Sequence, residues 1–596
     1  MGLLQRAVET YNANQSLIGE YREGHEPLVP IGHTLTSANI EITINHLGKF
    51  LSARKVDKSE PKIIIPVTEE SGGRTNAPAA HPLCDQLKYI SPQNEEEYGL
   101  YCQLLRAWSN STYSHPFLYP ILTYVENGSI LSDLEKSGNL LIDDKGKFDE
   151  KQFICWRVNG FDGEEPACWK NKNLFQAFIG FYEERMTNRE QAICMLNGET
   201  GPIATQHPKG IIPINGNAKI ISANDKTGFT YRGRFSEDWQ AATVSYVASQ
   251  KAHNALRWLA SEQGVREFSG NRIYLCWNPQ GRIMPSVMRG LRHSDEAPQY
   301  KPSDYRAELR STLFGLHQSA HFDGSEVAIV AAFDAATTGR LALTYYNEVS
   351  LRTFLERMET WDAYCCWYAG KFGIQSPSLK QIVDCAFGTQ RGAFLETDDR
   401  IQRQHLQKLL NCKVNGGIFP VDIVKALAQR ASTPLAYEEK NWRRIVHTAC
   451  AVIQKYHYDT KQGGDEMSWE LDKKDRSFQF GRLLAVLERA EQDYYQRSGE
   501  SRQTNAIKFM AEYRQRPWLV FERINRQLHQ AYLNRVQPWQ ANRYERLVGE
   551  ICGILKEFTE NELNYPLAEA YLMGYELQRN AFFTKNNNED VNETEE

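Results

Sequence analysis

Residues 327–346 read VAIVAAFDAATTGRLALTYY, and this stretch marks the place where the predicted structure changes along the chain. Val327–Phe333 and Leu341–Tyr346 are rich in β-branched and aromatic residues, which predicts two strands. After them the apolar residues recur at helical spacing, and a first helix is predicted over Tyr346–Trp367. Strands are therefore expected to give way to helices near residue 350.

The residues before this boundary predict a mixed α/β body over residues 1–350. Ala38–Asn45 alternates with the two-residue period of a strand, and Lys62–Val67 is a short apolar run containing one proline. Ala241–Glu262 places its apolar residues on one face of a helix. Together with the helices that follow residue 350, this pattern predicts an α+β fold.

The residues after the boundary predict helices only. We expect a helical connecting region over residues 351–457, a C-terminal helical bundle over 466–584 and an acidic tail over 585–596. Tyr458–Asp465, with the sequence YDTKQGGD, is typical of a linker between the first two parts. Met467 follows this linker directly.

Composition and charge exclude several classes of protein. The chain has 596 residues, a net charge of -5 and 41% hydrophobic residues, enough to fill sizeable cores. No run approaches the roughly 18 apolar residues of a membrane span, and the N-terminus lacks the pattern of a signal peptide, so we expect a cytoplasmic protein without membrane contact. The acidic balance argues against a free-standing protein that coats DNA but allows local basic patches.

No motif in the sequence nominates a catalytic or metal site. The 12 cysteines include no C-x-x-C pair and stand among apolar neighbours, which predicts buried, reduced thiols. No P-loop, H-E-x-x-H or G-x-S-x-G motif occurs. His81, His207 and His317 lack carboxylates at ligand spacing and are expected to be structural. We therefore expect no enzyme activity, no metal and no cofactor; an active site assembled from distant residues is the alternative.

One candidate for reading a DNA motif is Gly72-Gly73-Arg74-Thr75-Asn76, which is predicted to be a loop after a strand. Glycine lets a backbone approach a groove closely, and asparagine offers a donor and an acceptor to a base edge. Arginine attracts phosphate or enters a narrow minor groove. The same composition also fits an ordinary surface loop.

A second candidate, from Lys209 to Arg234, combines basic residues with Gly, Asn and an aromatic residue. This combination suits a groove that follows a nucleic-acid backbone. A β-rich surface with solvated lysines fits it equally well. The residues expected to contact the DNA backbone or a displaced strand are Lys209, Lys219, Asn224, Lys226, Arg232 and Arg234.

The C-terminal helices also carry many arginines, with fewer acidic residues nearby: Arg514, Arg516, Arg523, Arg526, Arg535, Arg543 and Arg546. A stripe of this kind could follow a single strand electrostatically. Pairs at helical spacing, such as Glu522 with Arg526, could instead neutralise the arginines inside the bundle.

Several motifs, in order along nearly the whole chain, resemble the large subunit of the type I-C CRISPR surveillance complex (Cascade). Each motif alone has low specificity, and the ordered combination is what carries the resemblance. The similar blocks are Arg74–Tyr89 (RTNAPAAHPLCDQLKY), Cys194–Ala204 (CMLNGETGPIA) followed by His207-Pro208, Pro377–Leu379, Gly417–Arg430 and Phe480–Glu488 (FGRLLAVLE). Two places depart from the family pattern: Ser222–Phe229 keeps only part of it, and Leu484 replaces a phenylalanine.

The resemblance implies a non-catalytic subunit that recognises the protospacer-adjacent motif (PAM) on double-stranded DNA, promotes R-loop formation, stabilises the displaced strand and supports recruitment of a helicase-nuclease. The implied partners are the guide RNA, the target duplex, the backbone and 5′-handle subunits, and a small subunit equivalent to the C-terminal region. An internal start at Met467 would supply that small subunit. The alternatives are a metal-dependent nuclease, recognised by metal-dependent cleavage, and a free-standing nucleic-acid-binding protein, recognised by its affinity without guide RNA.

Overall fold

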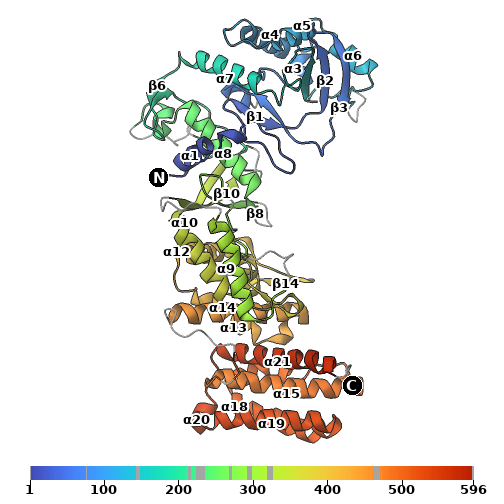
Figure 1. Ribbon diagram of the computed structural model, residues 1–596, viewed down its shortest axis with the longest axis vertical. Helices are drawn as coiled ribbons and strands as arrows, with labels where there is room; N and C mark the ends of the chain where they lie inside the picture. The colour runs from blue at the N-terminus through green and yellow to red at the C-terminus, as the bar shows by residue number, and fades with distance from the viewer. Residues whose placement is uncertain are drawn as a thin grey trace. The chain divides into compact units, whose positions relative to one another are not determined.

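The chain forms two compact units in the computed structural model (Figure 1). Unit 1 comprises Met1–Met284 and Val327–Glu348, and unit 2 comprises Pro285–Glu326 and Val349–Glu596. The residues that the structure describes are 2–74, 77–142, 148–212, 217–222, 235–266, 271–282, 284–291, 298–318, 326–337, 339–461, 470–471 and 473–592. Most strands lie in the N-terminal half and most helices in the C-terminal half, which confirms the predicted α+β fold.

One sheet of unit 1 has β2 (Ile40–Asn45) as its middle strand. It runs antiparallel to β3 (Phe50–Lys55) and parallel to β5 (Ile154–Asn159). The two-residue period of a strand places alternate side chains on one face, and those of β2 are fully buried: Ile40, Ile42 and Ile44. The helix α5 (Leu118–Glu126) packs against β2 and β5, so the predicted strand at 38–45 is a core element.

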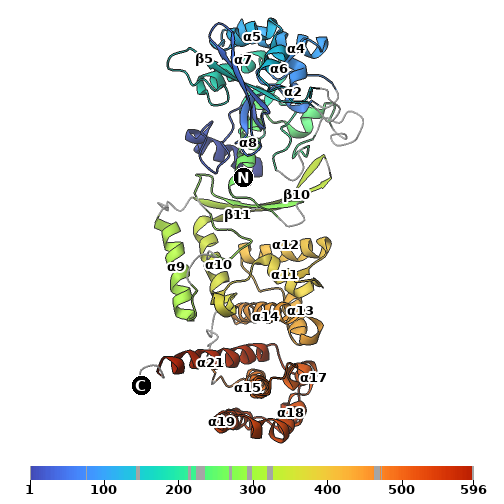
Figure 2. The same ribbon diagram turned by 90° about the vertical axis from the view of Figure 1, so that its right-hand side faces the viewer.

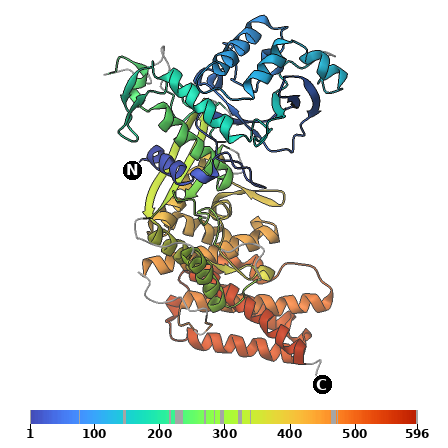
Figure 3. The ribbon, with the colours of Figure 1, turned by 45° about the horizontal axis from the view of Figure 1, so that its top comes forward.

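A second sheet of unit 1 has four strands in the order β11-β10-β9-β8. They are β8 (Val265–Arg266), β9 (Arg272–Trp277), β10 (Val327–Thr337) and β11 (Arg340–Ser350). The helix α8 (Tyr246–Glu262) packs on β9, and α1 (Leu3–Ala13) packs on α8 (Figure 3). β11 extends past the predicted end at Tyr346, because the Ser350 hydroxyl caps the following helix and fixes its start at Leu351.

A two-stranded ribbon of unit 1 leads into the candidate site. β1 (His33–Thr36) pairs antiparallel with β4 (Ile63–Pro66), and α2 (Glu69–Gly73) begins shortly after β4. The other elements of this unit are α3 (Leu87–Ile90), α4 (Glu95–Ser109), α6 (Ile130–Lys136), α7 (Lys172–Met186), β6 (Gln191–Ile193) and β7 (Thr200–Pro202).

The first part of unit 2 is a layered group of helices. α9 (Pro302–Gln318), which the sequence analysis did not predict, lies beside α10 (Leu351–Tyr364) (Figure 2). The other elements are β12 (Trp367–Tyr368), β13 (Ile374–Gln375), α11 (Leu379–Phe387), β14 (Thr389–Arg391), β15 (Phe394–Glu396), α12 (Asp399–Asn415), α13 (Val421–Ala431) and α14 (Glu439–Thr460). The short hairpins β12–β13 and β14–β15 interrupt a region that was predicted to be all helix.

The C-terminal part of unit 2 is a bundle around α15 (Arg476–Ser498), which is buried on nearly all sides. α21 (Ala570–Asn592) lies directly against α15 (Figure 1), and it extends into the segment predicted as an acidic tail. The remaining helices are α16 (Asn505–Lys508), α17 (Met510–Gln515), α18 (Pro517–Ala531), α19 (Pro538–Leu555) and α20 (Glu560–Leu563).

Two glycines allow the close approach of α15 and α21. A Cβ atom at Gly481 would lie 1.8 Å from the carbonyl oxygen of Tyr571, and one at Gly574 would lie 2.0 Å from that of Phe478. Both distances are far below van der Waals contact, so the two backbones meet where neither helix has a side chain. The glycine of the FGRLLAVLE block therefore has a packing role.

The cysteines agree with the prediction of buried, reduced thiols. All 12 cysteines are free, and ten of them are buried, with Cys412 and Cys552 half-buried. Among the described residues, no helix combines the length and the apolarity that crossing a bilayer requires.

Candidate nucleic-acid interface

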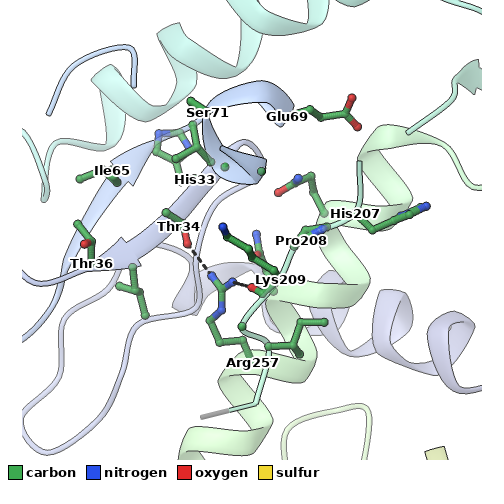
Figure 4. Close-up of a pocket in the computed structure, with 18 of the residues that line it drawn as sticks. His33, Thr34, Thr36, Ile65, Glu69, Ser71, His207, Pro208, Lys209 and Arg257 are labelled. Carbon is green, nitrogen blue, oxygen red and sulfur yellow. Dashed lines mark hydrogen bonds between the residues drawn. The ribbon is translucent and has the colours of Figure 1, made fainter. Parts of the chain in front are cut away.

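A cleft of about 530 Å³ lies on unit 1 between β1, α2, residues 206–211 and α8 (Figure 4). Gly72, Gly73 and Arg74 line it, and so does Lys209. The Lys209 ammonium lies 3.4 Å from the carbonyl oxygen of Arg74, although the two residues are 135 positions apart in the sequence. The two stretches that the sequence nominated separately therefore meet at one site.

The loop predicted over Gly72–Asn76 is wrong for Gly72 and Gly73, because both belong to the helix α2. Thr68 caps the helix: its hydroxyl accepts a hydrogen bond from the Ser71 amide at 3.1 Å, and its own amide donates to Ser71 Oγ at 3.0 Å. This reciprocal pair is a capping box, and two glutamates in the first turn favour the helix further. The glycine pair suggested a loop, whereas the cap determines the local structure.

Gly73 stands at the tightest point of the cleft wall. A Cβ atom there would lie 1.9 Å from Oε1 of Gln206, whereas one at Gly72 would meet nothing closer than Val67 at 3.9 Å. The close approach thus belongs to Gly73 alone. The end of the Gln206 side chain lies in the space that a side chain at Gly73 would fill.

Arg74 is held by an internal carboxylate. Its guanidinium donates to both oxygens of Asp85, at 2.6 and 2.9 Å, and to the carbonyl oxygen of Ala79 at 2.8 Å. It also lies over the ring of Tyr89, 4.6 Å from the centroid. Asp85 is fully buried, so the Arg74 side chain is fixed at the margin of the cleft.

Lys209 and Lys219 are half-buried cations close to one another. Burial lowers the pKa of Lys209, with a further contribution from Arg74, and burial and Lys209 together lower that of Lys219. Among the described residues, no carboxylate lies within 4 Å of either ammonium. The pair therefore gives this part of unit 1 a positive charge that no ion pair with a described carboxylate neutralises.

Arg257, which the sequence analysis missed, lies at the floor of the cleft. Its guanidinium donates to the Thr34 hydroxyl at 3.0 Å and to the Lys209 carbonyl oxygen at 3.1 Å (Figure 4). Burial lowers its pKa, and none of the described carboxylates pairs with it. The sequence did hold one sign of this residue: Arg257 is a charged residue between the apolar Leu256 and Trp258, both of which are buried in α8.

Four buried histidines surround this region. Burial lowers the pKa of His33, His81 and His253 to about 4. It lowers the pKa of His207 to about 3. The ring of His81 hydrogen-bonds the Ser71 hydroxyl at 2.9 Å, and that of His207 bonds the Ser249 hydroxyl at 2.8 Å. Both fulfil the structural role predicted for them. The side chain of His317 lies outside the described residues.

These histidines predict that unit 1 loses stability in mild acid. An unfolded histidine titrates near pH 6.5, so between pH 6.5 and 4 the unfolded chain binds protons that the folded chain does not. Stability is complete above about pH 6.5 and falls toward pH 4, by about 1.4 kcal/mol per histidine at pH 5.5. Thermal denaturation across this range measures the loss. His207→Gln should flatten the profile, and the exposed His46→Gln should not; equal profiles for both variants would contradict the assignment.

Several predicted residues lie outside the part of the chain that the structure describes. From the predicted motif-reading segment these are Thr75 and Asn76. From the residues predicted to contact the DNA backbone they are Asn224, Lys226, Arg232 and Arg234, and the possible internal start, Met467, lies outside as well. Their roles stay predictions. Of the predicted set, the structure thus brings together Gly72, Gly73, Arg74 and Lys209 at the cleft, with Lys219 nearby.

The arginines of the C-terminal bundle are mostly free of carboxylates. Arg523 pairs with Glu512 at 2.6 Å, and Arg514 donates to Gln429 at 2.9 Å. The predicted alternative, a pair between Glu522 and Arg526, is absent from the described ion pairs. No carboxylate of the described chain lies within 4 Å of the other six, which are Arg514, Arg516, Arg526, Arg535, Arg543 and Arg546.

The described residues contain no group of three or more His, Cys, Asp or Glu side chains placed to hold a metal ion. The cleft carboxylates are also bound internally. Glu26 pairs with Lys62 at 2.7 Å, and Glu69 accepts hydrogen bonds from Arg189 and from the Thr205 hydroxyl. The arrangement is suited to binding an anion.

Comparison with known proteins gives one match that covers nearly the whole chain. Residues 8–583 match the model of the family described as CRISPR-associated protein (Cas_Csd1). A search of curated proteins found no match. The matched range includes both units and every described residue of the cleft.

Proposed function

Because the chain belongs to the family of CRISPR-associated Cas_Csd1 proteins, we propose that it is the large subunit of a type I-C surveillance complex. In this role it recognises the PAM on double-stranded DNA, promotes R-loop formation, stabilises the displaced strand and supports recruitment of a helicase-nuclease. Base pairing with the guide RNA supplies most of the sequence specificity. The subunit itself acts without catalysis.

The observation that carries this proposal, beyond family membership, is the positive cleft of unit 1. Lys209 and Arg257 face it without a carboxylate partner among the described residues, although the whole chain has a net charge of -5. A local positive patch can bind nucleic acid that partner subunits bring to it. The negative net charge of the whole chain limits nonspecific coating of DNA. That balance suits a subunit positioned by partners.

The motif-reading role falls to the chain that follows α2. Arg74 follows that helix, lines the cleft and is held by Asp85. We assign the base contact to Asn76 and the anchoring to Arg74.

Asn76→Ala is expected to weaken binding of target duplex by the assembled complex by about 1–3 kcal/mol, with reduced discrimination between PAM variants. Arg74→Ala should have a similar effect, because it releases the anchor. Lys226→Ala and Arg232→Ala are the controls and should weaken binding without changing the preferred motif. Binding assays with a panel of PAM duplexes decide the matter: unchanged discrimination in both Asn76→Ala and Arg74→Ala removes this segment from motif reading.

Stabilisation of the displaced strand falls to the C-terminal bundle. Arg516, Arg526 and Arg546 have no carboxylate within 4 Å in the described chain, and free arginines follow a single strand electrostatically. We further propose that a fragment starting at Met467 acts as the small subunit of the complex. A purified complex without any fragment of roughly 130 residues, and unaffected by Met467→Ala, would exclude it.

A further inference from the structure

The size of the cleft limits what it can hold. Its volume of about 530 Å³ is that of a small-molecule pocket. A DNA duplex, in contrast, is bound over roughly 600 Å² or more of protein surface, even by a single small module. The interior of the cleft is therefore suited to one nucleotide of a single strand.

Arg257 is arranged to bind an oxyanion inside this volume. A guanidinium has five N–H groups, and the bonds to Thr34 and Lys209 use two of them. Those two bonds come from β1 and from the segment 206–211, so the side chain is oriented before any ligand arrives. Arginine binds phosphate through paired N–H groups, and the remaining N–H groups are available for that contact.

The described carboxylates of the cleft do not compete for this site. The two described carboxylates that line the cleft are Glu26 and Glu69, and each is bound by its own cation, Lys62 or Arg189. Lys209 adds a second cation, and among the described residues its ammonium makes one hydrogen bond, the long one to the carbonyl oxygen of Arg74. Burial also lowers the pKa of both Lys209 and Arg257, because it removes water from the two cations. A bound phosphate would replace that lost hydration with an opposite charge.

A buried carboxamide supplies the second, independent sign of a ligand. Gln250 lines the cleft from α8 and is only 7% exposed, yet its side chain makes no hydrogen bond to another described residue. Gln206 lines the same cleft and lies close to Gly73. A carboxamide offers a donor and an acceptor side by side, which matches the edge of a nucleobase.

We propose that this cleft binds one nucleotide of a single nucleic-acid strand, with its phosphate on Arg257 and Lys209 and its base edge at Gln206 and Gln250. The proposal rests on the function proposed above and deepens it. A nucleotide of the target strands separated beside the PAM and a nucleotide of the guide RNA share this chemistry. The probes below distinguish the two sources.

The test uses the full-length chain and fluorescence anisotropy at low salt. The probes are short labelled single strands of mixed sequence, in DNA and RNA form, and duplex DNA of the same length. We expect single strands to bind about tenfold more tightly than the duplex. Tighter binding of DNA assigns the site to a separated target strand, tighter binding of RNA assigns it to the guide, and equal binding shows recognition of phosphate and base without the sugar.

The variants separate the phosphate contact from the base contact. Arg257→Gln should weaken single-strand binding by about tenfold and reduce the salt slope by about one. Gln250→Leu should weaken binding and leave the salt slope unchanged. Lys55→Gln is the matched control, since Lys55 is an exposed lysine of unit 1 outside the cleft, and it should bind as the unchanged chain does.

Folding is checked on each variant by thermal denaturation. If Arg257→Gln fails to fold, Lys209→Gln replaces it, because that ammonium makes only the long contact to Arg74. Equal affinity for duplex and single strand, unchanged binding in the folded variants, or no strand binding by the unchanged chain would each overturn the proposal. The proposed function fails separately, if the assembled complex with the unchanged chain binds all PAM variants of the target duplex equally.

Discussion

Gly481→Ala is expected to unfold the C-terminal bundle or to destabilise it by on the order of 3–5 kcal/mol. The added methyl carbon would lie 1.8 Å from the carbonyl oxygen of Tyr571 and 2.8 Å from the amide nitrogen of Tyr575. Both are backbone atoms of α21 and cannot rotate away. The two helices must therefore separate, and the buried apolar side chains of α15 lose their contacts. Urea denaturation followed by circular dichroism measures the loss.

The bundle supplies its own matched controls. Gly549 and Gly553 lie in α19, and a Cβ atom at either would meet nothing within 4 Å. Replacing either with alanine should leave stability unchanged or raise it by up to about 1 kcal/mol, because alanine favours helix. Gly574→Ala should repeat the loss seen at Gly481. A Gly481→Ala bundle as stable as the Gly553→Ala bundle would show that the helices do not cross here.

Arg443→Met is expected to cost up to about 3–5 kcal/mol, because it removes one of the two arginines that two buried carboxylates share and leaves only Arg579 to both. The Arg443 guanidinium on α14 lies 3.6 Å from an oxygen of Glu488 on α15 and 3.6 Å from one of Glu576 on α21. Both glutamates are almost fully buried. The same substitution should therefore loosen the attachment of α14 to the bundle. Differential scanning calorimetry of the full chain reports both effects.

The loss in Arg443→Met should depend on pH with a defined sign. Burial already raises the pKa of Glu488, and Arg443 opposes that rise. Without Arg443 the pKa rises further, so the carboxyl is protonated more readily in the folded state. The deficit relative to the unchanged chain should thus shrink as pH falls from 8 to 5. Arg444→Met, at the exposed neighbouring position, is the control. Equal deficits for both variants would contradict the role of Arg443.

The spacing of apolar residues predicted those elements that bury a wide apolar face against their neighbours. The strand at Ile40–Asn45 and the helix at Tyr246–Glu262 were both identified from spacing alone. α9 was missed, since its described buried apolar residues form a narrow stripe, with one per turn: Tyr305, Leu309 and Leu313. A stripe of that width does not stand out in the sequence.

The candidate site could be predicted only in part, because its residues come from separate segments. Gly73, Arg74 and Lys209 carried a local signal of glycine and charge. Arg257 carried none that identified its role, because that role depends on Thr34 and on the Lys209 carbonyl oxygen, which only the fold brings near. The loop predicted around Gly72 failed for a local reason: the capping box at Thr68 outweighs two glycines.

The crossing of α15 and α21 also has a consequence for synthesis of the chain. Gly481 and Gly574 lie at opposite ends of the bundle sequence, so α15 emerges from the ribosome long before its partner. At about 5–20 residues per second, the delay is roughly 5–20 s. During that interval the apolar surface of α15 has no α21 to cover it. The bundle therefore completes its packing late. A nascent chain that stops before residue 574 exposes the apolar surface of α15 to chaperones and proteases.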